Sequence, residues 1–433
     1  MVDLLDAVVE RNPALIAETV SLHQDGLIPP DTFVIDLDAI AKNSAIISEA
    51  ATSEAVGLYY MSKQFGRNPV VCHYIEKSGI EKSVAIDVDE CKILHNYGFK
   101  IGHVGNLSQL PKADVDFVVG TVRPDVVTVY SLAAAEKISE AALRAGVNQR
   151  VLLRVRDRND FSYPRQISPG GFACEDIADV LNGLVKMKNI EIAGVTSFPV
   201  FRTDISRKEV FPLPNAETLV KSARRMNEAG IRISQINMPA DNSSVMFGMA
   251  KTAAREFGNS VWLEPGHGLS GTTPLHAFRT DLPEMPSIVY ATEISHSAGG
   301  EFYALGGGMM GADMVTGIWS ADFHHFYMHA LTGRDPVSII GGRCLASQVG
   351  FIDYYIPVRS ATSSDLNARS GDTVILGFRP QIFVTRSHVA AVKGIQKGSA
   401  ELLGIFDSRG NLLEKRTLKT KGTEETEEYL KSL

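Results

Sequence analysis

The feature that most constrains this chain is a regular alternation of short apolar runs and amphipathic stretches between residues 55 and 265. The runs are rich in Val, Ile and Leu, and most of the stretches between them carry apolar residues at helical spacing. Strand alternating with helix predicts right-handed βαβ units and a parallel sheet. Eight such runs favour a (β/α)8 TIM barrel over an open doubly wound sheet. They lie at 55–61, 83–88, 101–105, 126–131, 150–155, 192–198, 231–238 and 260–265.

The rhythm changes after about residue 285, where apolar runs follow one another across glycine-rich turns and helical stretches become rare. This spacing is typical of an antiparallel β domain. The run at 32–38 either opens the barrel or pairs with the C-terminal domain. The expected parts are a helical extension (1–31), the barrel (32–285), the C-terminal β domain (286–410) and a charged tail (411–433).

Composition and charge narrow the class of protein. Of 433 residues, 44% are hydrophobic and 21% are charged, which is ordinary for a globular chain. The formal net charge is −7 without a basic block, which argues against nucleic-acid binding. The four cysteines stand far apart, so neither a disulfide framework nor a zinc site is indicated. The chain shows no long apolar span and no signal-peptide pattern, so we expect a cytoplasmic protein that does not enter a membrane.

A lysine follows the first predicted barrel strand. Barrel enzymes carry their chemistry where strands end and the next loops begin, and Lys63 stands at such a place in the segment LYYMSKQFG. Partial burial lowers the pKa of an ammonium and makes it a usable amine nucleophile. The alternative is a surface lysine one residue beyond a strand.

The loops after the last two predicted strands combine glycine backbone and serine hydroxyl donors, which suits a phosphate group. They are MPADNSSV at 238–245 and EPGHGLSGTTP at 264–274, and each alone is equally an ordinary turn. Glu264 ends the eighth run. A buried carboxylate there needs an N–H or cationic partner such as a protonated pyridine nitrogen, unless it caps a turn or pairs with an arginine. Lysine, phosphate site and acid together suggest pyridoxal 5′-phosphate.

At this point the chain resembles the fold type III pyridoxal-phosphate enzymes, the superfamily of alanine racemase and ornithine decarboxylase, and within it the YhfX group. The matching segments include TFVIDLDAIAKN, YYMSKQFG, DVDECKILHNYGFKIGHVGN, LLRVRDRNDFSYPRQISPGGF, ADNSSV, LEPGHG and GGRCLASQVGFID. The resemblance implies a Schiff base on Lys63 and Glu264 at the ring nitrogen. It implies a phosphate site made by Asn242, Ser243, Gly266 and His267.

Three further residues are expected near the cofactor. His103 either touches it or packs under a loop. Arg154 or its neighbour Arg156 meets the cofactor or a substrate carboxylate, while the other meets a structural acid. Phe198 stands where the family often has histidine, so it can stack on a ring but cannot carry a proton. His267 likewise replaces the arginine of the decarboxylases' EPGR.

The resemblance implies an enzyme acting at the α-carbon of an amino acid, with a racemase favoured. A racemase needs a second acid or base, and Tyr303 and Cys344 are the candidates. The alternatives are a decarboxylase or a D-amino-acid aldolase or dehydratase, for which His388 with Cys344 is a weak metal pair. Two other classes remain: a non-catalytic carrier or regulator that binds the cofactor, and a cofactor-free Schiff-base barrel.

Assembly and metal binding complete the expectations. The resemblance implies a homodimer in which the β domain of one chain completes the site of the other. The histidines of HHFYMH at 324–329 do not share one helix face, so we read them as structural and expect no metal.

Overall fold

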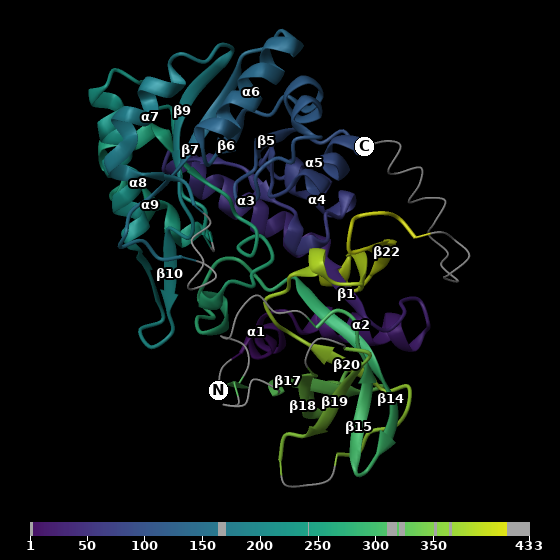
Figure 1. Cartoon of the computed structure of the whole chain (residues 1–433). Coiled ribbons are helices and arrows are strands. Elements are labelled where there is room, and N and C mark those ends of the chain that lie inside the picture. The colour runs from purple at the N-terminus through teal and green to yellow at the C-terminus, as the bar shows by residue number, and fades with distance from the viewer. Residues whose placement is uncertain are drawn as a thin grey trace. The chain divides into compact units, whose positions relative to one another are not determined.

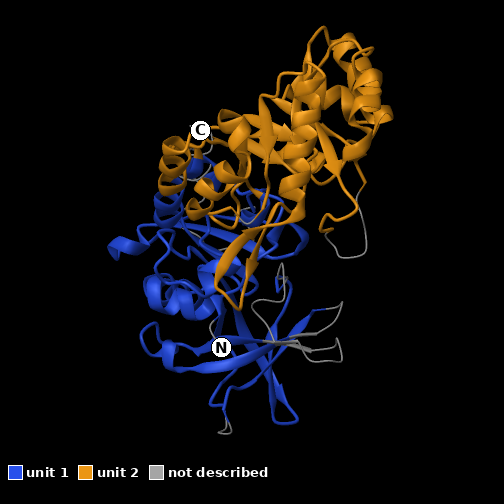
Figure 2. Ribbon diagram, turned by 90° about the vertical axis from the view of Figure 1, so that its left-hand side faces the viewer, with its two compact units in different colours: residues 1–44, 63–75, 269–433 blue, residues 45–62, 76–268 orange. Residues whose placement is uncertain are grey.

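The computed structural model describes residues 3–162, 170–240, 242–309, 318–319, 325–349, 353–362 and 366–413. The chain divides into two compact units, coloured separately in Figure 2. Unit 1 consists of residues 1–44, 63–75 and 269–433, and unit 2 consists of residues 45–62 and 76–268. The predicted tail falls almost entirely outside the described residues, and the whole segment YPRQISP (163–169) within the strand-five match does so too.

Unit 2 is built on a nearly closed parallel barrel, which confirms the predicted fold class. Its two end strands, β2 and β3, flank Tyr59 in the chain, and the backbone N–H of Tyr59 donates to the carbonyl of Leu263 at 3.1 Å. Each of the eight predicted runs contains a strand, and the first run is divided into two. The strand order is β2 (Gly57–Leu58), β13 (Val261–Leu263), β12 (Gln235–Asn237), β9 (Ile190–Thr196), β7 (Gln149–Arg156), β6 (Val126–Val129), β5 (Ile101–Val104), β4 (Ser83–Ala85) and β3 (Tyr60–Met61), with β8 (Phe172–Ala173) beside β7.

Helices connect these strands along the chain (Figure 1). Their starts carry the expected caps: the Asp87 carboxylate accepts from the N–H of Glu90, and the Ser131 hydroxyl from that of Ala134. Gly146 ends its helix in the left-handed conformation. The connecting elements are α3 (Leu37–Ser53), α4 (Pro69–Lys77), α5 (Val88–Asn96), the π-helical turn η2 (Phe117–Val122), α6 (Leu132–Ala145), α7 (Ile177–Leu184), the hairpin β10 (Phe201–Asp204) and β11 (Glu209–Pro212), α8 (Pro214–Glu228) and α9 (Phe247–Ala253).

The barrel core is filled by aromatic and branched side chains. Tyr59 stacks on Trp262 with ring centres 4.6 Å apart. A side chain at Gly57 would collide with Trp262, and one at Gly102 would collide with Tyr59, so both strand positions require glycine. Around Tyr59 pack Met61, Val84, Ile86, Val126, Leu152 and Ala193.

Unit 1 holds the antiparallel β domain that the sequence predicts. Six strands form a closed ring, because β14 pairs with both β15 and β20. The ring runs β14 (Ile288–Ala298), β15 (Glu301–Leu305), β19 (Tyr355–Ser360), β18 (Arg343–Val349), β17 (His325–Gly333), β20 (Thr373–Leu376) and back to β14, with β16 (Ile318–Trp319) beside β17. The sheet continues from β14 into β1 (Thr32–Asp36), β21 (His388–Lys393) and β22 (Glu401–Asp407).

The N-terminal helices belong to unit 1. They are α1 (Leu4–Arg11) and α2 (Pro13–Gln24), and their apolar faces share one core with the sheet, including Leu5, Ile16 and Val289. Strand β1 pairs antiparallel with β14 and parallel with β21, so residues 32–36 lie within the sheet of the β domain. Among the described residues, no helix is long and apolar enough to cross a membrane.

Candidate functional site

Two loops at the carboxyl ends of β12 and β13 carry buried donors. The side-chain oxygen of Asn242 accepts hydrogen bonds from the backbone N–H groups of Glu264 (3.0 Å) and Ala240 (3.3 Å). These two donors fix the orientation of the amide, so its NH2 group faces away from them. Within the described residues, this NH2 group and the hydroxyl of Ser243 are buried without a hydrogen-bond partner. Such unpaired donors are costly unless a ligand accepts from them.

The loops fit together closely enough to form a cradle. A Cβ on Gly268 would lie 1.9 Å from the backbone oxygen of Asn242. The backbones of the two loops therefore approach each other at a distance that only glycine permits. Gly266 is buried, and His267 is 3% exposed. A small anion with several acceptor oxygens, such as a phosphate, matches this set of donors. The structure therefore brings together the residues expected to form the phosphate site.

Glu264 lies at the centre of a polar network inside the barrel. His103 Nδ1 lies 2.5 Å from Glu264 Oε1, Asn237 donates to the same oxygen at 2.9 Å, and Asn106 donates to Oε2 at 2.5 Å. Glu264 and His103 are both fully buried. The other nitrogen of His103 lies 2.6 Å from the hydroxyl of Thr128. His103 therefore contacts the predicted acid, and both of its ring nitrogens are engaged.

Three members of this network are not predicted from the sequence: Asn106, Thr128 and Asn237. Each is a polar residue inside, or directly after, an apolar run that forms a barrel strand. A buried strand offers such a side chain no water, so it must bond to another polar group inside the barrel. That signal was present in the sequence, but the partner could come only from the structure.

Arg154 is a second buried polar group at the carboxyl ends of the strands. It is 3% exposed, it donates to the carbonyl of Phe198 at 3.0 Å, and its guanidinium lies 5.6 Å from the ring centre of Tyr130. Burial lowers the pKa of Arg154. Its Nη1 is buried without a partner among the described residues, so this cation retains a donor for an anionic ligand. The neighbouring Arg156 is exposed and donates to the carbonyl of Gly171.

Lys63 begins the short helix η1 (Lys63–Phe65), two residues after β3 ends. The preceding residue, Ser62, is fixed by a 2.6 Å hydrogen bond to Glu90 within unit 2. Within unit 1, the ammonium of Lys63 lies 5.5 Å from the ring centre of Phe383. The lysine thus follows a barrel strand, as predicted, and is half-buried.

The two candidates for a second acid or base lie on opposite faces of the β ring. Directly paired strand residues share a face, and neighbours along a strand alternate. By this register, Cys344 faces the ring interior and Tyr303 faces outward. The inner face is traced through the paired positions Ala304, Ile356, Val358, Ala346 and Cys344.

Their surroundings differ accordingly. Cys344 is fully buried, and burial raises the pKa of its thiol to about 12, which makes it a poor proton donor or acceptor near neutral pH. Tyr303 is half-buried, stacks on His296 with ring centres 5.1 Å apart, and donates to Glu301 at 3.3 Å. The structure argues against the catalytic role considered for Cys344.

The metal pair of His388 and Cys344 is not supported by the sheet order. His388 lies on β21 and Cys344 on β18, with four strands between them. Strands in a sheet are about 4.8 Å apart, so one ion cannot reach both residues.

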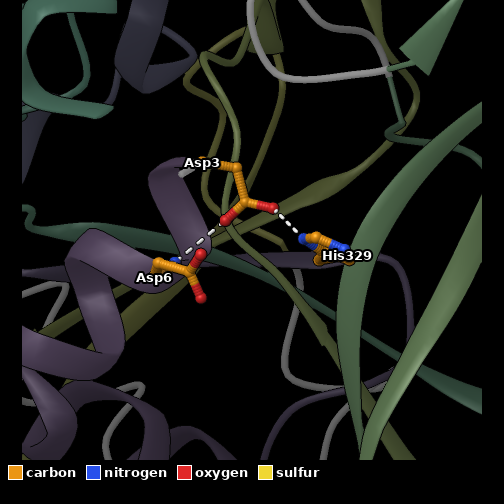
Figure 3. A group of neighbouring side chains, drawn as sticks. All are labelled: Asp3, Asp6 and His329. Atoms are coloured by element: carbon orange, nitrogen blue, oxygen red, sulfur yellow. Dashed lines mark hydrogen bonds and ion pairs between the residues drawn. The ribbon is translucent and has the colours of Figure 1, made fainter. Parts of the chain in front are cut away.

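A different group, Asp3, Asp6 and His329, offers ligand atoms within 4.8 Å of one another (Figure 3). Its hydrogen bonds already account for the arrangement: Asp3 accepts from the N–H of Asp6 as a helix cap and pairs with His329 at 2.7 Å. Arg343 donates to Asp6 at 2.6 Å, which places a positive charge beside the cluster. Of the three histidines in the HHFYMH segment, His329 belongs to this cluster, His325 begins β17, and His324 lies outside the described residues.

Comparison with known proteins gives consistent matches. Residues 35–274 match the family model of the alanine racemase N-terminal domain, and residues 289–402 match that of the YhfX-like C-terminal domain. The Escherichia coli (strain K12) protein described as "Uncharacterized protein YhfX" is 35% identical over 412 residues, which covers 94% of this chain and 99% of the relative.

Solved structures share the fold at low sequence identity. Alanine racemase from Clostridium difficile 630, in complex with cycloserine, is 18% identical with a TM-score of 0.58, covering 88% of this chain and 99% of that chain. D-threonine aldolase from Filomicrobium marinum is 13% identical with a TM-score of 0.59, covering 88% and 95%. The same fold occurs in a diaminopimelate decarboxylase from M. jannaschii and a D-threo-3-hydroxyaspartate dehydratase from Delftia sp. HT23.

Proposed function

We propose that this chain, which belongs to the alanine-racemase-like family of pyridoxal-phosphate enzymes and to its YhfX-like group, itself binds pyridoxal 5′-phosphate and acts at the α-carbon of an amino acid. The observation that carries the proposal is the pair of buried, unpartnered donors on Asn242 and Ser243. They stand beside a buried carboxylate, Glu264, which has acceptor capacity left.

Each residue has a proposed task. The phosphate is bound by Asn242, Ser243, Gly266 and His267. Glu264 accepts a hydrogen bond from the protonated ring nitrogen. Lys63 forms the Schiff base and afterwards acts as a base on one face of the substrate. When bound, the cofactor supplies an electron sink that weakens the bonds at the α-carbon.

Arg154 and Phe198 are proposed to border the same site. The unpartnered Nη1 of Arg154 suits a carboxylate or a phenolate oxygen. Phe198 is half-buried and offers a ring face, while its carbonyl fixes Arg154.

Racemisation is the proposed reaction, because it uses Lys63 and a second acid or base on the opposite face. Tyr303 is the proposed second group, since it lies on the outer face of the β ring whereas Cys344 lies inside it. We further propose a homodimer in which Tyr303 of one chain completes the site of the other.

A lyase is the second candidate, either a decarboxylase or a D-amino-acid aldolase or dehydratase. It is favoured by the burial of Cys344 and by the hydrogen bond of Tyr303 to Glu301, because both observations weaken the case for a second acid or base beside Lys63. One base suffices to remove a carboxyl or side-chain group. A non-catalytic cofactor carrier would bind the cofactor without changing any amino acid.

The test begins with reconstitution of the purified protein with pyridoxal 5′-phosphate. We expect a visible Schiff-base band that borohydride fixes onto the protein. Lys63→Ala should lose the band and all turnover, while the exposed control Lys77→Ala keeps both. A borohydride-stable adduct at full stoichiometry in Lys63→Ala would reject Lys63.

The reaction is then identified by incubating the holoenzyme with D- and L-amino acids in deuterated water. A racemase yields both enantiomers with deuterium at the α-carbon, and a lyase yields carbon dioxide, an aldehyde or ammonia. Mixed Lys63→Ala and Tyr303→Phe chains should regain activity if the dimer has composite sites. Full activity of a monomer would reject the composite site.

A further inference from the structure

The barrel of unit 2 contains a chain of hydrogen bonds that crosses its interior. It runs from Thr128 on β6 through His103 on β5 to Glu264 after β13. It continues through Asn237 on β12, which accepts from Thr196 on β9 at 3.0 Å. All five side chains are at most 1% exposed. Strand β5 is separated from β13 by four strands in one direction around the barrel, so the bond between His103 and Glu264 spans the interior.

Glu264 depends on these partners for its charge. A buried carboxylate is costly unless donors or a cation compensate it. Within the described residues, His103 is the one basic side chain within ion-pair distance of Glu264. Because His103 is itself fully buried, water cannot replace it.

One acceptor position of Glu264 has no donor among the described residues. A carboxylate offers about four acceptor positions, and described side chains occupy three of them: two on Oε1 and one on Oε2. Within the same residues, the side-chain oxygen of Asn106 is also buried without a hydrogen-bond partner. A ligand N–H group that reaches Oε2 of Glu264 would therefore find the acceptor that remains.

We infer that His103 is a positioning residue for Glu264: backed by Thr128, it holds Glu264 as an ionised carboxylate that keeps the ring nitrogen of the cofactor protonated. This inference rests on the proposed function. It makes the electron-withdrawing strength of the cofactor depend on His103, which contacts both Glu264 and Thr128. Removing His103 takes away one of the hydrogen bonds that hold Oε1 of Glu264, so the group that faces the ring nitrogen and keeps it positively charged is held less firmly.

The Schiff base itself reports this charge, because the ratio of its visible to its near-ultraviolet band depends on the proton bound to the chromophore. We would compare this ratio in the wild-type holoenzyme, His103→Leu and His103→Asn. Leucine removes the donor, whereas the amide of asparagine can place an N–H near the position of Nδ1. The ratio should fall about tenfold or more in His103→Leu, the effect of one charge-assisted hydrogen bond. His103→Asn should recover most of it.

Thr128→Val tests the same chain of hydrogen bonds and leaves every residue that contacts Glu264 unchanged. The hydroxyl is lost while the shape is kept, and we expect a smaller fall of about two- to tenfold. Thr292→Val is the matched control, because Thr292 is a buried strand threonine that donates to the carbonyl of Leu305 in unit 1. It should leave the ratio unchanged. Thr128→Val decides the question if His103→Leu fails to fold.

The outcomes separate this inference from the proposed function. A wild-type protein that takes up no pyridoxal 5′-phosphate would overturn both. Normal cofactor uptake with an unchanged band ratio in Thr128→Val and in any folded His103 variant would overturn the role of His103 alone. A fall in Thr292→Val equal to that in Thr128→Val would also overturn it, since the ratio would then follow stability.

Discussion

The chain contains a nearly closed parallel barrel and a closed antiparallel ring, and the interiors of the two differ in kind. The parallel barrel of unit 2 has an apolar floor around Tyr59 and, at the carboxyl ends of its strands, a polar layer centred on Glu264. The antiparallel ring of unit 1 is lined mostly by apolar side chains such as Ala330, Cys344 and Leu376, and the side chains of Thr292 and Tyr290 share this inner face. Among the described residues, the buried carboxylate of Glu264 and its hydrogen-bonding partners therefore give the barrel of unit 2 a more polar interior than the ring of unit 1.

The difference follows from how each sheet closes. Parallel strands bring all their following loops to one end, where several polar residues meet from different strands. The inward-facing side chains of a six-stranded antiparallel ring fill its interior, so a residue there such as Cys344 is cut off from water. The contrast teaches that a reactive residue type, such as the Cys344 thiol, has no chemistry without access.

The first prediction tests whether the floor of the parallel barrel is as tightly packed as its glycines suggest. A methyl group on Gly102 would lie 1.9 Å from the ring of Tyr59, which stacks on Trp262 and cannot easily move. Gly102→Ala should lower the free energy of unfolding by about 3 kcal/mol or more, as overpacking does. Chemical denaturation measures this loss.

Gly248→Ala serves as its control. Gly248 lies in α9, where the added methyl would meet Glu54 only at 3.7 Å, an ordinary contact. This variant should gain up to about 1 kcal/mol from helix propensity. Equal stability of Gly102→Ala and the wild type would contradict a filled barrel floor.

The second prediction makes one substitution in each unit. Ser243 in unit 2 and Ser347 in unit 1 both bury a hydroxyl without a partner among the described residues. Ser243→Ala should weaken binding of pyridoxal 5′-phosphate about 10- to 150-fold, because one charge-assisted hydrogen bond of about 1.5–3 kcal/mol is lost. Ser347→Ala should leave cofactor affinity unchanged.

Thermal melting without cofactor completes this comparison. Each variant removes an unsatisfied buried hydroxyl, so each should be as stable as the wild type or more stable by up to about 1 kcal/mol. Equal cofactor affinity in the Ser243 and Ser347 variants would mean that the phosphate does not bind at the loops after β12 and β13.

Much of the fold could be predicted from the sequence, because period-two and period-3.6 patterns are local. The same holds for Asn242, Ser243 and Glu264, which follow strands whose ends meet in any parallel barrel. The partners of Glu264 could not be predicted, because they lie on strands across the barrel. The roles of Cys344 and Tyr303 depend on strand register and on closure of the ring. The local sequence around these two residues predicts neither of these features.

A last comparison concerns one acid in each unit, the fully buried Glu264 and the half-buried Asp31. Among the described residues, Glu264 in unit 2 accepts from three side chains, whereas Asp31 in unit 1 accepts from the hydroxyl of Tyr290 at 2.8 Å. Burial therefore dominates at Asp31 and raises the pKa of its carboxyl from 3.8 to about 7. The folded protein thus holds a proton that the unfolded chain releases between about pH 4 and pH 7.

The third prediction follows from the upward direction of this pKa shift. The stability contributed by protonated Asp31 is complete below about pH 4 and is lost as pH rises through about 7. Asp31→Asn cannot ionise, keeps an oxygen for Tyr290, and suits the left-handed backbone at this position, where φ is 60°. Its free energy of unfolding should therefore fall less between pH 4 and pH 8, by about 1–2 kcal/mol relative to wild type. The carboxyl of Glu76 in unit 2, whose pKa burial also raises to about 7, is present in both proteins and cancels in their difference. Denaturation of both proteins across this range gives the measurement, with the exposed Glu49→Gln as a variant that should follow wild type. Parallel pH profiles for Asp31→Asn and wild type would mean that polar partners compensate the carboxyl of Asp31 as fully as that of Glu264. The contrast between these two acids would then fail.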